Sequence, residues 1–187
     1  MRQKKLSRIF FIIAAVFITL AFGLFVVHTY LGADFLRPTQ NLLPPASHFL
    51  KDDVREFNVA VMSDTGSHNH VIERVIDDAR SDENIPGFIM YLGDLVSDRR
   101  PANFYWMFRE MGRHLNGMPF YMIPGNHDVE KRGNIDKRYY RAVVGPTYYW
   151  FGYGDTLFIA MDSSDVIEEE QFEWLAETLE FIRPLFR

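Results

Sequence analysis

Cysteine is absent from the 187-residue chain, which excludes a disulfide framework, a thiolate metal site and a cysteine nucleophile. Histidine is scarce: there are six, and none follows His127. An excess of positive charge is also lacking, since 20 Lys and Arg stand against 25 Asp and Glu, so we expect no nucleic-acid partner. The hydrophobic content of 48% excludes a disordered polyelectrolyte. Any metal ion must therefore be bound by oxygen atoms and imidazole rings.

Charge is distributed unevenly along the chain. Residues 1–8 contain four basic residues and precede the first acidic residue, Asp34, so residues 9–187 hold 16 basic against 25 acidic residues, a net charge of −9. From Ile9 to Val27 no residue is charged and only Thr19 is polar. These 19 residues would extend about 28 Å as a helix, close to the thickness of the hydrocarbon core of a bilayer.

This pattern predicts an uncleaved transmembrane signal-anchor helix over residues 9–31 that contacts the lipid bilayer. The positive-inside rule keeps the basic head, residues 1–8, in the cytoplasm, and predicts a single-pass membrane protein with an extracytoplasmic domain. A cleaved signal peptide is the main alternative, although its apolar region is usually shorter and residues 26–32 offer no small-x-small cleavage site. Residues 32–55 follow as a proline-containing tether.

The remaining residues, 56–187, have the pattern of one α/β domain. Short apolar runs predict three strands buried on both faces, and they lie at residues 58–63, 87–92 and 119–123. Helical periodicity falls between them, over residues 70–80 and 101–116. This β-α-β-α-β order is typical of a parallel sheet with crossover helices.

A different pattern follows these three strands. Residues 147–151 and 156–161 predict a hairpin around the turn 152–155. Residues 168–183 predict a closing amphipathic helix. Its inward side chains are expected to be Phe172, Trp174, Leu175, Leu179 and Ile182.

Each predicted parallel strand ends in residues that could bind a metal ion. Asp64 follows the first strand, Asp94 the second, and Asn126 with His127 and Asp128 the third. In open α/β sheets ligands bind just beyond the carboxyl ends of the strands, so these clusters should converge on one crevice. Oxygen and imidazole ligands suit Mn, Fe, Zn or Mg. Two such cations held close together can clamp a phosphoryl group and generate a hydroxide nucleophile.

The segment Gly125-Asn126-His127-Asp128 after an apolar strand, with the two aspartate segments, resembles the calcineurin-like metallophosphoesterase family over about residues 56–180. The resemblance implies one half of a four-layer αββα sandwich and a site for two divalent metal ions. It implies that Asp64 binds the first metal, Asp94 bridges both, and Asn126 binds the second and contacts the phosphate. It also implies that His127 stabilises the transition state or protonates the leaving oxygen, with Asp128 orienting its ring.

The first motif departs from the usual family pattern. Its third position is Gly66 rather than histidine, the form found in the purple acid phosphatase branch, but Ser97 stands where that branch has a tyrosine ligand. His68 and His70 are possible substitute ligands for the absent histidine, while a surface loop or helix cap is their simpler interpretation.

The family's later metal ligands are also histidines, and this chain has none after His127. We therefore expect a domain truncated at its C-terminus, whose missing half, or a partner chain, would complete the site. The chain alone should have little or no dinuclear activity. One face of the sheet should be left uncovered and exposed.

Simpler interpretations remain open for single residues. Asp64 and Asp94 could be helix N-caps, which aspartate favours. Arg99 and Arg100 could contact a phosphate, although a solvated loop is the default.

Two functions therefore compete. The first is a membrane-anchored phosphoesterase that hydrolyses a phosphate ester by metal-bound hydroxide, present here as an incomplete domain. The alternative is a non-catalytic, membrane-tethered pseudoenzyme that binds metal or phosphate. Phosphomonoesters, phosphodiesters, nucleotides and lipid-linked phosphates all fit these residues.

Overall fold

The computed structural model describes residues 13–23, 54–81, 83, 85–131, 133–164 and 169–183. The chain forms two compact units, Met1–Leu36 and Arg37–Arg187. In the first, residues 13–23 are helical and their large apolar side chains are exposed. Within the described ranges no helix combines the length and the apolar character that a membrane crossing needs. The rest of the predicted anchor, residues 9–12 and 24–31, lies outside the described residues, as do residues 1–8 and the tether up to residue 53.

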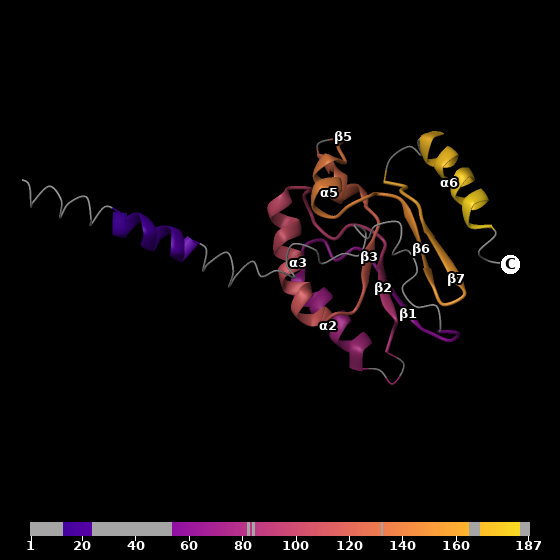
Figure 1. The fold of residues 1–187 in the computed structure, drawn as a ribbon, viewed down its shortest axis with the longest axis horizontal. Helices are drawn as coiled ribbons and strands as arrows, with labels where there is room; N and C mark the ends of the chain where they lie inside the picture. The colour runs from indigo at the N-terminus through magenta and orange to yellow at the C-terminus, as the bar shows by residue number, and fades with distance from the viewer. Residues whose placement is uncertain are drawn as a thin grey trace, which may run out of the picture. The chain divides into compact units, whose positions relative to one another are not determined.

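The second unit contains the predicted parallel sheet, with strand order β1-β2-β3 (Figure 1). Its strands are β1 (Val59–Met62), β2 (Phe88–Tyr91) and β3 (Phe120–Met122). Val59 lies opposite Phe88, and Ile89 lies opposite Phe120. The crossover helices are α2 (Asn69–Ser81) and α3 (Pro101–Leu115). The α/β class and the positions of these five elements are therefore confirmed.

Four short elements that the sequence pattern did not predict follow β3. They are α4 (Asn126–Val129), β4 (Glu130–Lys131), β5 (Asn134–Ile135) and α5 (Arg138–Val143). A buried core fills the space between the sheet and the helices, with Ile72 and Ile76 from α2, Phe104 and Met107 from α3, and Ile89, Tyr91, Phe120 and Met122 from the sheet. The polar loops at the ends of the strands lie outside this core, at the edge of the sheet.

The other face of the sheet is covered by a hairpin, contrary to the expectation that it would be exposed. Strands β6 (Tyr149–Tyr153) and β7 (Thr156–Ala160) form this hairpin. Phe88 and Tyr121 of the sheet are buried beneath it, and the ring of Tyr121 stacks on that of Phe151 with centroids 3.8 Å apart. Aromatic side chains from both layers thus form a second core.

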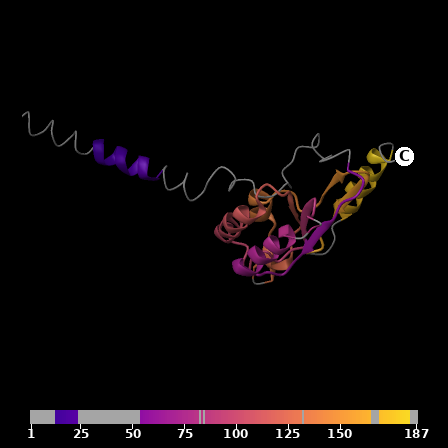
Figure 2. The same cartoon turned by 90° about the horizontal axis from the view of Figure 1, so that it is seen from below.

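The last helix, α6 (Glu169–Ile182), lies against the outer face of the hairpin. The Tyr148 and Trp174 ring centroids are 4.9 Å apart, and those of Trp150 and Phe181 are 6.4 Å apart. Figures 1 and 2 show α2 and α3 on one side of the sheet and α6 on the other side, beyond the hairpin. The order of layers is helices, sheet, hairpin, helix.

The rotation of α6 about its axis differs in part from the sequence prediction: Ile182 is buried as expected, but Phe172 and Leu179 are not. Phe172 and Leu179 are 53% and 46% exposed, whereas the polar Gln171 and Thr178 are buried. The Gln171 amide accepts the backbone N–H of Asp162 at 2.7 Å and donates to the Asp162 carbonyl at 2.9 Å. Two hydrogen bonds to Asp162, two positions beyond the end of β7, direct this polar face inward, and Phe172 and Leu179 turn outward.

Replacing buried and exposed phenylalanines tests this layering. Phe151→Ala should lower the free energy of unfolding by about 3–5 kcal/mol, because it opens a cavity in the aromatic core. Phe172→Ala, the matched surface change, should alter it by no more than about 0.5 kcal/mol. Urea denaturation of the full chain measures both. An equal loss of unfolding free energy in the two variants would indicate that Phe172 is buried, as the sequence predicted, and would contradict the observed rotation of α6.

Candidate metal and phosphate site

Backbone hydrogen bonds join the loops that follow β1 and β2. The Asp64 N–H donates to the Gly93 carbonyl at 3.1 Å, and the Gly66 N–H donates to the Asp94 carbonyl at 3.0 Å. Ser97, at the position of the tyrosine ligand in the purple acid phosphatase branch, donates its hydroxyl to the Gly66 carbonyl at 2.5 Å. The predicted convergence of the Asp64 and Asp94 segments therefore holds at the level of the backbone.

Both aspartates adopt a left-handed backbone conformation, each with φ of 59°. This region costs free energy for residues other than glycine, although aspartate tolerates it better than most. Neither aspartate caps a helix: α2 begins at Asn69, and the N-cap of α3 is Arg100. The simpler cap interpretation is thus wrong. Strained backbone held in place by its surroundings is characteristic of functional sites.

Tyr91 at the end of β2 holds the first loop, a role that the sequence analysis missed. Its buried hydroxyl accepts the Thr65 N–H at 2.9 Å and shares a hydrogen with the Thr65 hydroxyl at 2.6 Å. Burial raises the pKa of Tyr91 to about 12, so the hydroxyl stays neutral. The sequence did contain an indication of this role: Tyr91 is a tyrosine in an otherwise apolar strand, and a buried hydroxyl needs a hydrogen-bond partner.

Two glycines bring the second and third loops into direct backbone contact. A Cβ atom on Gly93, whose φ is +98°, would collide with the backbone nitrogen of Gly125. A Cβ atom on Gly125 would collide with the backbone nitrogen and the carboxylate of Asp94. The His127 N–H also donates to Asp94 Oδ1 at 2.9 Å. Glycine at both positions therefore allows Asp94 to lie against the Asn126–His127 turn.

Asp128 is fully buried, and its partners differ from those that the resemblance implied. Its Oδ2 accepts the N–H groups of Asp94 at 2.8 Å and Gly125 at 2.9 Å, and its Oδ1 accepts the Val96 N–H at 3.1 Å. Within the described residues its hydrogen bonds therefore go to the backbone, not to the ring of His127. Burial raises the pKa of Asp128 to about 6, partly offset by these three hydrogen bonds.

The two candidate substitute histidines lie at the end of the first loop. His68 Nδ1 is 2.7 Å from the Thr65 carbonyl, which can only accept, so Nδ1 carries a hydrogen and, in the neutral ring, Nε2 is left as the acceptor. His70 lies in the first turn of α2, with its ring centroid 6.2 Å from that of His68. Metal-binding histidines commonly have one ring nitrogen fixed in this way, a feature that distinguishes His68.

The two arginines after Asp98 form ion pairs. Arg99 is only 9% exposed, its guanidinium is 2.7 Å from the carboxylate of Asp136, and it lies over the ring of Tyr139. Arg100 is exposed and pairs with Asp98 at 3.3 Å. Hydrogen bonds from Arg138 and Arg99 hold the pKa of Asp136 well below its usual range. Arg99 is thus buried in an ion pair with Asp136 rather than lying in a solvated loop, and a phosphate contact by Arg99 or Arg100 stays a prediction.

The side chains at this edge fit a divalent cation in part. Asp64, Asp94 and Asn126 bring oxygen donors from three adjoining loops, and among the described residues the side chains of Asp64 and Asn126 make no hydrogen bond within the protein. Such oxygen donors suit hard cations. Yet in the described part of the chain no group of three or more His, Cys, Asp or Glu side chains is arranged to hold a metal ion. The described residues thus supply an incomplete set of ligands.

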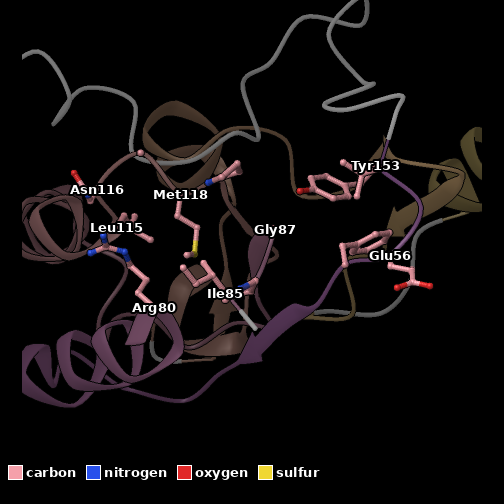
Figure 3. A pocket seen from close by; sticks show the side chains of 13 residues that line it. Glu56, Arg80, Ile85, Gly87, Leu115, Asn116, Met118 and Tyr153 are labelled. Atoms are coloured by element: carbon pink, nitrogen blue, oxygen red, sulfur yellow. The ribbon is translucent and has the colours of Figure 1, made fainter. Parts of the chain in front are cut away.

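A pocket of about 500 Å³ lies at the opposite end of the sheet. It is lined by Gly87 and Pro119, which directly precede β2 and β3, and by Arg80 from the last turn of α2. Figure 3 shows the side chains of Ile85 and Met118 pointing toward one another beside Gly87. This pocket is therefore separate from the loops that carry the aspartates.

Comparison with known proteins gives a family and remote structural likenesses. The family model for calcineurin-like phosphoesterases matches residues 57–184. Among solved structures the chain is similar to the purple acid phosphatase PPD1 isolated from yellow lupin (Lupinus luteus) seeds, with a TM-score of 0.48 and 16% sequence identity. The match covers 67% of this chain and 28% of that one, so this chain corresponds to under a third of that protein. No curated protein sequence matches.

The raised pKa of Asp128 predicts a pH-dependent contribution to stability. Because the folded pKa of about 6 exceeds the ordinary value of 3.8, the folded chain binds this proton more tightly than the unfolded chain. The contribution is therefore fully present below about pH 4 and is lost as the pH rises through about 6. Urea denaturation with a chelator should show that the unfolding free energy of the wild type, relative to Asp128→Asn, falls over this window. A constant or rising difference would contradict the assignment.

Proposed function

Because the chain belongs to the calcineurin-like phosphoesterase family, we propose that it acts on phosphate esters as a metal-dependent hydrolase. The observation that carries the proposal is the close approach of three loops at the carboxyl end of the sheet. Hydrogen bonds place the Asp64, Asp94 and Asn126–His127 segments next to one another.

Each residue at this edge has a proposed task. Asp64 and Asp94 would hold the cation through their carboxylates, and Asn126 would contribute its amide oxygen and contact the phosphate. A bound divalent cation would lower the pKa of water and offset charge on the phosphoryl oxygens. His127, exposed at the start of α4, would donate a proton to the leaving oxygen. His68, with Nε2 left as the acceptor, is the candidate additional ligand.

A second candidate function is binding without turnover. The described residues include no group of three or more His, Cys, Asp or Glu side chains arranged for a metal ion, which favours this alternative. The chain would then hold one cation weakly, or a phosphate, through the same three loops. A missing second half or a partner chain could supply the remaining ligands for the hydrolase.

Titration with Mn²⁺ and an assay with p-nitrophenyl phosphate separate these functions. Asp94→Asn should lower Mn²⁺ affinity and hydrolysis by at least about tenfold to a hundredfold, since even residues that only orient ligands have effects of this size. Asp98→Asn, the matched change in the same loop, should leave both unchanged, because that carboxylate pairs with Arg100.

Each outcome assigns a function. Mn²⁺ binding with turnover that depends on Asp94 supports the hydrolase. Mn²⁺ binding without turnover supports the binding protein. A wild-type chain that binds no Mn²⁺, or an Asp94→Asn variant that behaves like the wild type, would overturn the site.

We also propose that residues 9–31 anchor the protein in a membrane, with residues 1–8 in the cytoplasm and the phosphoesterase domain outside it. The run from Ile9 to Val27 without charge supports this. The exposed apolar side chains of helix 13–23 also support it, because a helix that is apolar all round is normally covered by protein or lipid. The substrate would then be met at the outer membrane surface.

Carbonate extraction of membranes that contain the full chain tests the anchor. The wild type should remain in the pellet, whereas Ile13→Lys with Phe17→Lys should reduce that retention, since a lysine in an apolar span costs up to about 2.5–3.5 kcal/mol, the value at its centre. Ile13→Leu with Phe17→Leu is the matched control and should stay in the pellet. A soluble wild type would refute the anchor. An intact mass that lacks about the first thirty residues would show a cleaved signal peptide instead.

A further inference from the structure

The Asp128 carboxylate is shared between two loops that come from different strands. Asp94 and Val96 lie in the loop after β2, and Gly125 in the loop after β3, yet all three donate their N–H groups to this one side chain. Oδ2 bridges the loops directly, because it accepts from Asp94 and from Gly125. The carboxylate thus joins the backbone of a candidate metal ligand to the turn that carries Asn126.

The hydrogen bond to Asp94 acts on a strained residue. Asp94 has φ of 59°, a conformation that must be held by its surroundings. Its N–H is fixed by Asp128 at 2.8 Å, and its own Oδ1 is fixed by the His127 N–H at 2.9 Å. Both ends of Asp94 are therefore held by the segment 125–128, and the first of these bonds depends on the side chain of Asp128.

Burying the carboxylate of Asp128 costs the folded chain free energy. Asp128 is 0% exposed, and its partners in the described part of the chain are backbone N–H groups rather than a cation. Removing a carboxylate from water without a counter-charge is unfavourable, and three N–H donors compensate only in part. The two oxygen atoms of the carboxylate accept all three N–H groups, whereas the amide of an asparagine would place an N–H₂ donor against at least one of them.

We propose that Asp128 is a positioning residue that holds Asp94 in its left-handed conformation and fixes the Asp94 carboxylate relative to Asn126. The role in metal binding rests on the proposed function, whereas the role in holding the backbone does not. Asp128 itself contacts neither metal nor phosphate in this scheme. It acts through Asp94 and Gly125.

Amide hydrogen exchange of the metal-free full chain tests the backbone role. In the wild type the N–H groups of Asp94, Val96 and Gly125 should exchange at similar, slow rates, because one carboxylate protects all three. In Asp128→Asn, which keeps the shape but replaces one acceptor oxygen with an amino group, at least one of them should exchange about tenfold faster or more. Three unrelated rates in the wild type would overturn the proposal even if the variant failed to fold.

The matched control is Asp162→Asn, a second buried aspartate that bonds outside these loops. Asp162 Oδ1 accepts the N–H and hydroxyl of Ser164, and Oδ2 lies 3.0 Å from Lys137 Nζ. This variant also disturbs a buried carboxylate, so it should lower stability while leaving the exchange of the Asp94, Val96 and Gly125 amides unchanged. Equal acceleration in the two variants would reduce Asp128 to a general contribution to stability and overturn the proposal.

Mn²⁺ titration tests the consequence for the site. Asp128→Asn should lower Mn²⁺ affinity by about tenfold to a hundredfold, the range seen when residues that orient ligands are changed, and Asp162→Asn should not. If the wild type binds Mn²⁺ and Asp128→Asn binds it equally well with unchanged exchange, the positioning role is wrong and the proposed function stands. If the wild type binds no Mn²⁺, the proposed function fails, and the exchange rates alone decide whether Asp128 holds the loops.

Discussion

The close backbone contact between Gly93 and Gly125 is the constraint on which the candidate site depends. Neither position has room for a Cβ atom, so the loops after β2 and β3 lie directly against each other. The carboxylate of Asp128 and the N–H of His127 then bond across this contact to Asp94. The first loop joins the same assembly through backbone bonds to Gly93 and Asp94. Three segments far apart in the chain thereby become one rigid edge, which is the preorganisation that a metal or phosphate site requires.

The two cores of the second unit support this edge without taking part in it. Helices α2 and α3 pack on one face of the sheet, and the aromatic hairpin packs on the other, so β2 and β3 are held from both sides. The strands therefore deliver Asp94 and Asn126 from a fixed base. The pocket at the amino ends of the strands lies away from this edge, so its size says nothing about the chemistry at the loops. Position relative to the strand ends is the better guide to function in a parallel sheet.

Charge at the candidate site is dominated by acidic side chains. Asp64 and Asp94 contribute carboxylates, while Arg99 is buried against Asp136 and Arg100 pairs with Asp98. An edge with two carboxylates would repel a phosphate ester, because the neighbouring arginines are already paired with other carboxylates. A divalent cation would offset the charge of the two carboxylates and attract the phosphoryl oxygens of the same substrate. Electrostatics and family membership therefore lead to the same proposal of a metal-dependent phosphoesterase.

The sequence by itself determined the α/β class, the order of the main strands and helices, and the placement of Asp64, Asp94 and Asn126 just beyond three strands. These features follow from periodicity and local spacing, which are written within a few residues. Only the tertiary structure decided that Asp128 bonds to backbone groups 32 and 34 residues away, that Arg99 pairs with Asp136, and that Gln171 turns α6 to expose Phe172. Their partners are distant in the chain, and a side chain can satisfy the same hydrogen-bonding need in many ways until the fold supplies one partner.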